Sequence, residues 1–406
     1  MPARARGAVF VWGARAIPLV TRASATPGGR TLTEAYLSQP AIMAGVAFGW
    51  LRATGTLDLE GLTLRRGELT HGAWGEGYVD RRHPHSYVHE AMLGLVTPSE
   101  APTTASLFAG RGYVPFGSDD PMLRPFAAFP GNHHLAQIVE RLVVVGAVRY
   151  AGVSAEGAVF NGDEPIDPAI PPLARRFGDS WSTRATLDGA VLAPSLADAE
   201  LSASYAFVKS PEFREGNGLD QRKAHVGLRL GASTSQYALV EWARTVDLDR
   251  GRALYTFNSL LAEGAVCRRG GGGVALRVEQ SERPEEERLV DLFRSARPAT
   301  DNSIVGVTRW TTWTGAVSFP GVAAAVGLVA PFLEVARIAV HRASAGAFDP
   351  TLIYGGSDGW RMSAGARLVA GRIHDRMGRY GAAESMTSPL TAHPHSRASQ
   401  VPRCFP

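Results

Sequence analysis

Residues 272–280 read Gly-Gly-Val-Ala-Leu-Arg-Val-Glu-Gln, and this stretch decides the fold. Val274, Leu276 and Val278 alternate with small or charged residues such as Arg277. Successive side chains of a β-strand point to opposite faces, so a period of two predicts a strand with one apolar face and one polar face. The same alternation recurs at residues 199–208 and 223–232.

The links between consecutive strands of the C-terminal half alternate in length. A transmembrane up-and-down barrel has short turns on one rim and longer loops on the other. The Greek-key links of a soluble sandwich have no reason to alternate in this way. The long links are 209–222, 282–301 and 342–358, the short ones are 233–235, 268–271 and 319–321, and 247–252 is intermediate.

We therefore predict an all-β fold, an antiparallel up-and-down transmembrane β-barrel with an even number of roughly 12–16 strands. Two short loop helices are expected, one at residues 135–142 and one at 284–293. The irregular stretch 115–142 can fold into the lumen as a plug or a constriction. Aromatic girdles at the membrane surfaces are expected from Trp310, Trp313, Phe332, Trp242, Tyr237, Tyr255 and Phe257.

The segment Trp310–Leu333 has no charged residue and is long enough to be considered as a membrane helix. Pro320 lies in its middle and Pro331 near its end, and proline inside a helix removes a hydrogen bond and clashes with the preceding turn. Two strands joined by a turn at Phe319–Gly321 are the better interpretation.

Composition narrows the function classes. The chain has 42 basic and 38 acidic residues among 406, and the net charge of +4 gives no reason to expect nucleic-acid binding. Cys267 and Cys404 are the only cysteines, which excludes a disulfide scaffold and a cysteine-based metal site.

Both ends of the chain differ from the middle. Residues 1–40 begin with Arg4, Arg6 and an apolar stretch, which indicates either a signal-like segment or a mis-assigned start. Residues 382–406 are rich in Ser, Thr, Pro and His without any period, which indicates a disordered tail. The barrel is therefore expected within residues 41–381.

Histidines and charged residues gather in two polar stretches, 75–90 and 112–134. In an extended chain, His83, His85 and His89 point to the same face, where imidazoles could bind Zn²⁺ or Cu²⁺. His133 and His134 could complete such a site if their stretch enters the lumen. The alternative is a hydrogen-bonded polar cluster of the lumen without a metal, formed by Asp80, Arg81, Arg82, Glu90, Asp119 and Asp120.

Three segments carry a resemblance to a known family: Asp80–His85, Phe160–Pro165 and Tyr205–Pro211. With them, residues from about Leu57 to Tyr380 resemble an uncharacterised family of Gram-negative outer-membrane β-barrel proteins, porin-like in architecture. The resemblance implies the barrel fold, the bacterial outer membrane as location and outer-membrane lipid as surroundings. It implies no mechanism.

These observations favour a porin-like channel or a structural barrel, with small solutes or ions as its partners. Inward polar residues, including Arg229, Arg277, Glu279, Arg81 and Arg82, would then set any solute preference. A barrel that binds Zn²⁺ or Cu²⁺ through its histidines is the first alternative, and a soluble β-rich secreted enzyme is the second. No serine lies in a G-x-S-x-G elbow, so we expect no enzymatic activity and no cofactor other than that metal.

Overall fold

The computed structural model describes residues 7–26, 29–64, 85–97, 103–165, 167–231, 236–268, 271–286, 304–325, 327–343, 349–372 and 377–384. Strands in this part of the chain form one antiparallel sheet in which each strand pairs with the next along the sequence, except that β14 and β15 both pair with β16. The strands are β1 Val9–Thr26, β2 Arg30–Phe48, β3 Leu51–Asp58, β4 Val88–Val96, β5 Thr103–Gly112, β6 Arg141–Tyr150, β7 Val153–Phe160, β8 Ser180–Asp188, β9 Ala199–Val208, β10 Asp220–Leu230, β11 Tyr237–Asp249, β12 Arg252–Cys267, β13 Gly273–Glu286, β14 Ile304–Ser318, β15 Val322–Ala324, β16 Gly327–Arg342 and β17 Asp358–Gly371.

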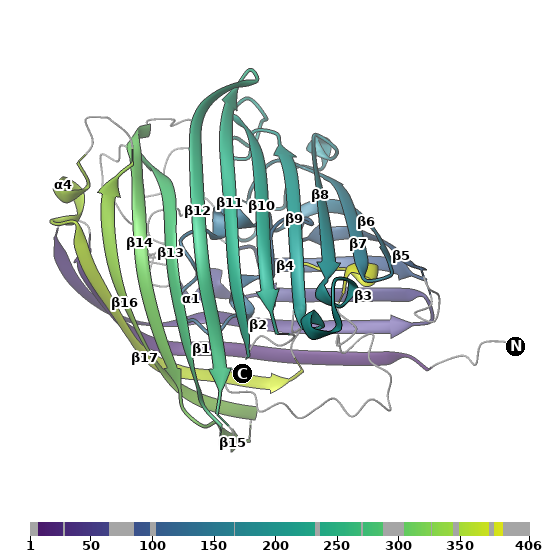
Figure 1. Cartoon of the computed structure of the whole chain (residues 1–406), viewed down its shortest axis with the longest axis horizontal. Coiled ribbons are helices and arrows are strands. Elements are labelled where there is room, and N and C mark those ends of the chain that lie inside the picture. The colour runs from purple at the N-terminus through teal and green to yellow at the C-terminus, as the bar shows by residue number, and fades with distance from the viewer. Residues whose placement is uncertain are drawn as a thin grey trace, which may run out of the picture.

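The sheet closes on itself into a barrel (Figure 1), because β1 pairs with β17 as well as with β2. The short strand β15 continues the line of β14 along β16, so these two pieces act as one wall strand and the 17 assigned strands make a 16-stranded barrel. The predicted all-β fold and the even number of strands are confirmed. Short helices interrupt the loops: α1 Glu60–Thr63, α3 His133–Ala136, α4 Pro350–Tyr354 and the 3₁₀ turns at 121–123, 174–176, 189–191, 194–196 and 381–383.

The barrel wall begins earlier than the sequence indicated. β1 forms backbone ladders with both of its neighbours, from Gly13 opposite Gly371 to Ala23 opposite Arg361 on the β17 side. The assignment of residues 1–40 to a segment outside the barrel is therefore corrected for β1 and for the first part of β2. At the other end, residues 385–406 of the expected tail lie outside the described residues.

The two rims differ as the link lengths predicted. One rim, the short-turn rim, includes the tight turn between β6 and β7, where Ala151 and Gly152 both have positive φ, as a two-residue hairpin of the primed type requires. The opposite rim, the long-loop rim, includes the links 59–87, 161–179 and 343–357. It also has two short links, between β1 and β2 and between β11 and β12.

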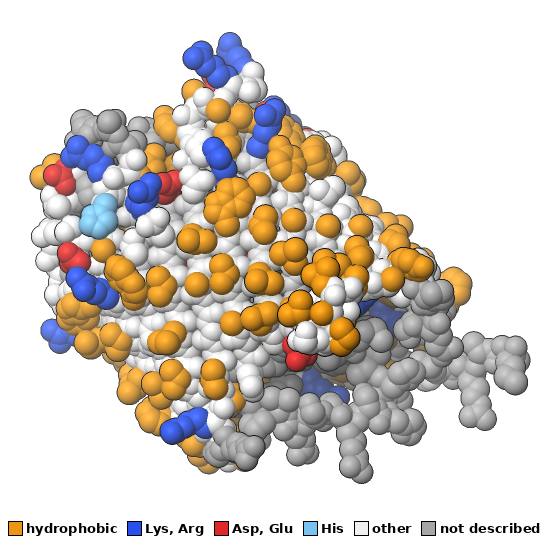
Figure 2. Space-filling model, viewed as in Figure 1, with side chains coloured by type: hydrophobic (Ala, Val, Ile, Leu, Met, Phe, Trp, Pro, Cys, Tyr) orange, Lys and Arg blue, Asp and Glu red, His pale blue; other side chains and the backbone are white. Residues whose placement is uncertain are grey.

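The outer face of the wall is apolar, and the inner face carries many charged and polar residues together with apolar clusters that pack against the inward loop. In β10, Val226, Leu228 and Leu230 point outward and are 44–47% exposed, whereas His225 and Arg229 point inward and are buried. Figure 2 shows such apolar side chains as bands across neighbouring strands. An apolar exterior around a polar interior is the arrangement of a membrane barrel and the reverse of a soluble protein.

The aromatic residues divide between the two faces. Trp313 points outward, as a girdle residue does. Trp310, Phe332, Tyr237 and Phe257 are buried inside the barrel, so the girdle expected from them is corrected.

The segment Trp310–Leu333 forms strands, as predicted, and not a helix. Its strand pairing reverses between β15 and β16 rather than at Phe319–Gly321, which only interrupts the pairing with β16. None of the helices among the described residues has the length and apolar character needed to cross a bilayer.

The structure differs from the prediction at both expected loop helices. Only α3 forms in the first, because the carbonyls of Ile138 and Leu142 accept hydrogen bonds from Val114 and Asn161 instead of from a helical turn. In the second, Pro284 pairs with Val307 as part of β13, and residues 287–293 lie outside the described part of the chain.

Candidate functional site

The link between β5 and β6, Tyr113–Glu140, folds into the barrel and is called the inward loop. Wall side chains from distant strands bind its backbone. Gly117 N donates to Ser204 Oγ on β9 at 2.9 Å, and Ala127 N donates to Glu334 Oε2 on β16 at 2.7 Å. The loop therefore spans the lumen and is fastened on several sides, as its irregular sequence suggested.

Glycine is required where the inward loop comes nearest to itself. Gly117 has a φ of +75°, and a Cβ at this position would lie 1.7 Å from the carbonyl oxygen of Ala136. Any larger residue would force the two arms of the loop apart.

Charged residues of the inward loop are paired with charges on the wall. Asp119 lies 3.4 Å from Arg229 Nη1 on β10. Arg124 Nη1 lies 3.4 Å from Glu263 Oε1 and 3.6 Å from Glu241 Oε1. Removing one partner of such a buried pair leaves an uncompensated charge, so these contacts hold the loop in one position. Burial lowers the pKa of Arg124, but the charges of Glu263 and Glu241 outweigh burial and raise this pKa above its usual value.

A second cluster lies where the two ends of the β3–β4 link meet the inward loop. His85 Nδ1 is 3.3 Å from Asp58 Oδ2 and 3.6 Å from Glu60 Oε2. The His85 ring stacks on His89 with 5.3 Å between centroids. Asp58, His85 and His89 each offer a ligand atom, and these atoms lie within 4.8 Å of one another. His89 Nδ1 contacts Glu140, and Nε2 contacts Tyr113 and lies 3.4 Å from Asp120.

Neighbouring charges shift the pKa values of His85 and Asp120 in this cluster. Burial alone would lower the pKa of His85, but the hydrogen bond to Asp58 and the charges of Glu140 and Glu60 outweigh it and raise the pKa to about 9. Burial would raise the pKa of Asp120, but its contacts with His89 and Tyr113 lower it to about 2. Asp120 is therefore ionised and His85 is protonated at neutral pH.

The sequence-predicted site residues are brought together only in part. The His133 ring lies 6.4 Å from that of His85 and 3.9 Å from that of His134. Glu90 accepts hydrogen bonds from Thr54 and Thr56, both at 3.2 Å. Four predicted residues lie outside the described part of the chain, namely His83, Asp80, Arg81 and Arg82.

Several residues of the interior were not singled out from the sequence. Asp58 and Glu60 join the histidine cluster, and Glu156 and Arg184 form a buried pair on neighbouring strands. The alternation of faces along β7 and β8 carried a signal for this pair, because both residues lie opposite to the apolar face. No periodicity marked Asp58 and Glu60, since they lie where β3 ends.

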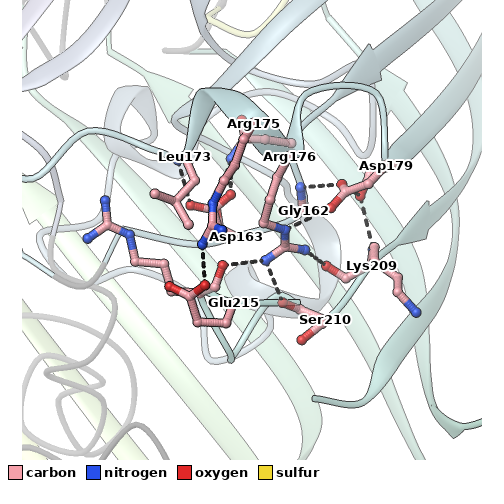
Figure 3. A network of polar contacts seen from close by, with 12 residues as sticks. Gly162, Asp163, Leu173, Arg175, Arg176, Asp179, Lys209, Ser210 and Glu215 are labelled. Atoms are coloured by element: carbon pink, nitrogen blue, oxygen red, sulfur yellow. Dashed lines mark hydrogen bonds and ion pairs between the residues drawn. The ribbon is translucent and has the colours of Figure 1, made fainter. Parts of the chain in front are cut away.

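The second and third segments behind the family resemblance, Phe160–Pro165 and Tyr205–Pro211, meet at the long-loop rim. Arg176 donates to Asp179 Oδ2 at 2.8 Å, and the same guanidinium donates to carbonyl oxygens of the β9–β10 link, including that of Phe213 at 3.0 Å. Asp163 accepts a hydrogen bond from Leu173 N at 2.9 Å. Figure 3 shows Arg176 at the centre of this loop clasp. The clasp joins two loops and has no geometry that points to a ligand.

Comparison with known proteins gives a fold. No protein-family model matches the chain, and no curated protein does. Solved structures do match: the anion-selective porin from Comamonas acidovorans has a TM-score of 0.51 at 11% identity, over 90% of this chain and 100% of that chain. The chain has the porin fold.

Two further solved structures match the chain. OprB of Pseudomonas putida has a TM-score of 0.51 at 7% identity, over 90% of this chain and 94% of that one. OmpT, an outer membrane protein of Vibrio cholerae in a trimer form, has a TM-score of 0.50 at 8% identity, over 90% and 100% of the two chains. At these identities the likeness concerns the architecture.

Proposed function

We propose that this porin-fold chain is a channel of the bacterial outer membrane that passes small solutes or ions. The observation that carries the proposal is the contrast between the two faces of the wall, apolar outside and charged inside. An apolar band suits lipid, and a polar interior suits water and solutes. A soluble secreted enzyme would not expose rows of leucine and valine such as Leu228 and Val226.

The inward loop would set the width of the pathway. It crosses the lumen and carries charges of both signs, for example Asp119 and Arg124, that are balanced by wall residues such as Arg229 and Glu263. Because positive and negative groups are paired around it, we expect weak selectivity between anions and cations.

Ion conductance in planar bilayers tests the channel proposal. We expect discrete current steps from the purified protein, and a small reversal potential in a KCl gradient. A variant in which residues 118–131 are replaced by a short Gly-Ser linker should give larger steps, because the obstruction is removed. Correctly folded protein that passes no current, with or without the loop, would contradict the proposal and leave a structural barrel.

A metal site is the second candidate, because Asp58, His85 and His89 are close enough to share one ion. A carboxylate and two imidazoles are a donor set that suits Zn²⁺ or Cu²⁺, and Glu60 lies close enough to His85 to be a further ligand. The ion would have to displace the proton of His85, so its affinity should rise with pH.

Titration calorimetry with Zn²⁺ and Cu²⁺ in detergent tests this second candidate. The triple variant His83→Ala, His85→Ala, His89→Ala should lose binding. His225→Ala is the matched control, because His225 is also buried and paired with a carboxylate, Glu241, but lies outside the cluster. Absence of binding to the parent protein would end the idea.

A further inference from the structure

The segment that follows the last strand returns to the inside of the barrel. Residues 377–384, here called the C-terminal segment, include Met377, Tyr380 and Ala382, which are at most 3% exposed. β17 ends at the short-turn rim, whereas the segment packs on β5 and β6, on the far side of β1–β4 in the wall. In Figure 1 its yellow turn lies among the blue strands β5 to β7.

The C-terminal segment fits closely against the wall. Ala382 N donates to Ser106 Oγ on β5 at 2.9 Å, and the rings of Tyr380 and Phe108 lie 5.4 Å apart. Gly381 has a φ of +55°, and a Cβ there would lie 2.5 Å from Ser106 Cβ. Such tight packing leaves no room for a larger side chain.

The same segment is also joined to the inward loop. Tyr380 OH accepts a hydrogen bond from Tyr113 N at 3.0 Å, and Arg379 Nε lies 3.4 Å from Asp119 Oδ1. Arg379 Nη2 further contacts Glu200 Oε1 on β9 at 2.7 Å. A buried arginine is costly unless it is paired. Because Arg379 finds carboxylates on both the wall and the loop, these pairs favour the docked position of the segment.

We propose that Met377–Glu384 is an internal plug that narrows the lumen from the short-turn side and rests against the inward loop. The inference rests on the proposed channel function, because a plug can restrict flow only if the lumen conducts solutes or ions. Its contacts with wall and loop combine hydrogen bonds and ion pairs with apolar packing of Met377, Tyr380 and Ala382. None of them extends the strand ladder, as a permanent part of the wall would do. The segment thus restrains flow through its own barrel.

Two variants should release the plug. Arg379→Ala combined with Tyr380→Ala removes the charge pairs and the buried ring, and Gly381→Val introduces a clash with Ser106. Gly146→Val on β6 is the matched control, because a Cβ at Gly146 meets nothing within 4 Å.

Whether the C-terminal segment is docked is measured separately from ion current. With Ser106→Cys in each background, reaction with a soluble thiol reagent is followed at residue 106 by peptide mass spectrometry. We expect labelling several-fold faster in both release variants than in the parent or the control, because the docked segment covers part of residue 106, which is half-buried. Equal rates in all backgrounds would overturn the plug.

Single-channel conductance is then measured for the same proteins. Larger current steps in the release variants than in the parent and the control would support the plug as the element that narrows the pathway. Faster labelling with unchanged current steps would overturn that role and leave the channel function intact. Faster labelling with no current in any variant would overturn the channel function, while the docked position of the segment would stand.

Discussion

Glu156 on β7 and Arg184 on β8 are opposite each other in the strand register and are joined by two parallel hydrogen bonds. Arg184 Nε and Nη2 lie 2.5 and 2.7 Å from the two carboxylate oxygens, and both side chains are 1% exposed. Arg184 also donates to the carbonyls of Gly117 and Gly378, at 3.3 and 2.9 Å. One wall pair therefore holds both the inward loop and the C-terminal segment.

Removing this arginine should destabilise the barrel strongly. Arg184→Ala leaves the Glu156 carboxylate buried without its partner, and we expect a loss of about 3–5 kcal/mol in the free energy of unfolding. The measurement is urea unfolding of protein inserted in lipid vesicles. Arg337→Ala is the control, because its pair with Asp358 is exposed on both sides and should be worth less than about 1 kcal/mol. Equal effects of the two substitutions would contradict the assignment.

The loop clasp gives a second prediction, with neighbouring arginines as test and control. Arg176→Ala removes the hydrogen bonds that join the β7–β8 and β9–β10 links, and we expect about 2–4 kcal/mol less local stability. Arg175→Ala removes only an exposed pair with Glu215. Limited proteolysis should cut the links 161–179 and 209–219 much faster in the first variant. No difference between the two variants would show that the clasp does not restrain the loops.

The sequence predicted the barrel wherever the lumen side of a strand is polar. In β13 the inward residues include Arg277 and Glu279, and the alternation is clear. In β1 it is hidden, because Ile17 and Leu19 point inward and pack against Ala127 of the inward loop. Both faces of β1 are therefore largely apolar, and the strand was taken for a signal-like segment. Where the inward loop packs against the wall, inward side chains can be apolar, and the alternation of polar and apolar residues that predicts a strand is lost.

The sequence predicted which charged residues face the lumen better than it predicted which residues they pair with. The period of two placed Arg229 and Arg277 in the lumen correctly. Their partners come from elsewhere: Asp119 lies 110 positions away from Arg229 in the sequence. Such pairs depend on the path of a long irregular loop, and that path is set by tertiary contacts that no local pattern encodes. For the same reason Asp58 was missed beside His85.

The histidine cluster predicts a pH dependence of stability in the metal-free protein. The pKa of His85 is raised to about 9 from an unfolded value of about 6.5, so folding favours the protonated form. This contribution is full below about pH 6.5 and is lost as the pH rises through about 9; it amounts to at most about 3 kcal/mol. Unfolding is followed between these pH values with a chelator present. His85→Gln should flatten the dependence of the free energy of unfolding on pH. If the dependence were the same in this variant and in the parent, His85 would not be its cause.

The outward face of the wall gives the test on which the membrane location depends. Val240 lies on β11 and is 48% exposed, between the inward residues Leu239 and Glu241, which are 2% and 1% exposed. If this face contacts hydrocarbon, Val240→Arg should cost about 2–4 kcal/mol of folding free energy in lipid vesicles, because the guanidinium must leave water. Leu352→Arg, on α4 at the long-loop rim and 81% exposed, should cost almost nothing. If Val240→Arg were equally harmless and the protein stayed monodisperse without detergent, the outer face would be in contact with water and the channel proposal would fail with it.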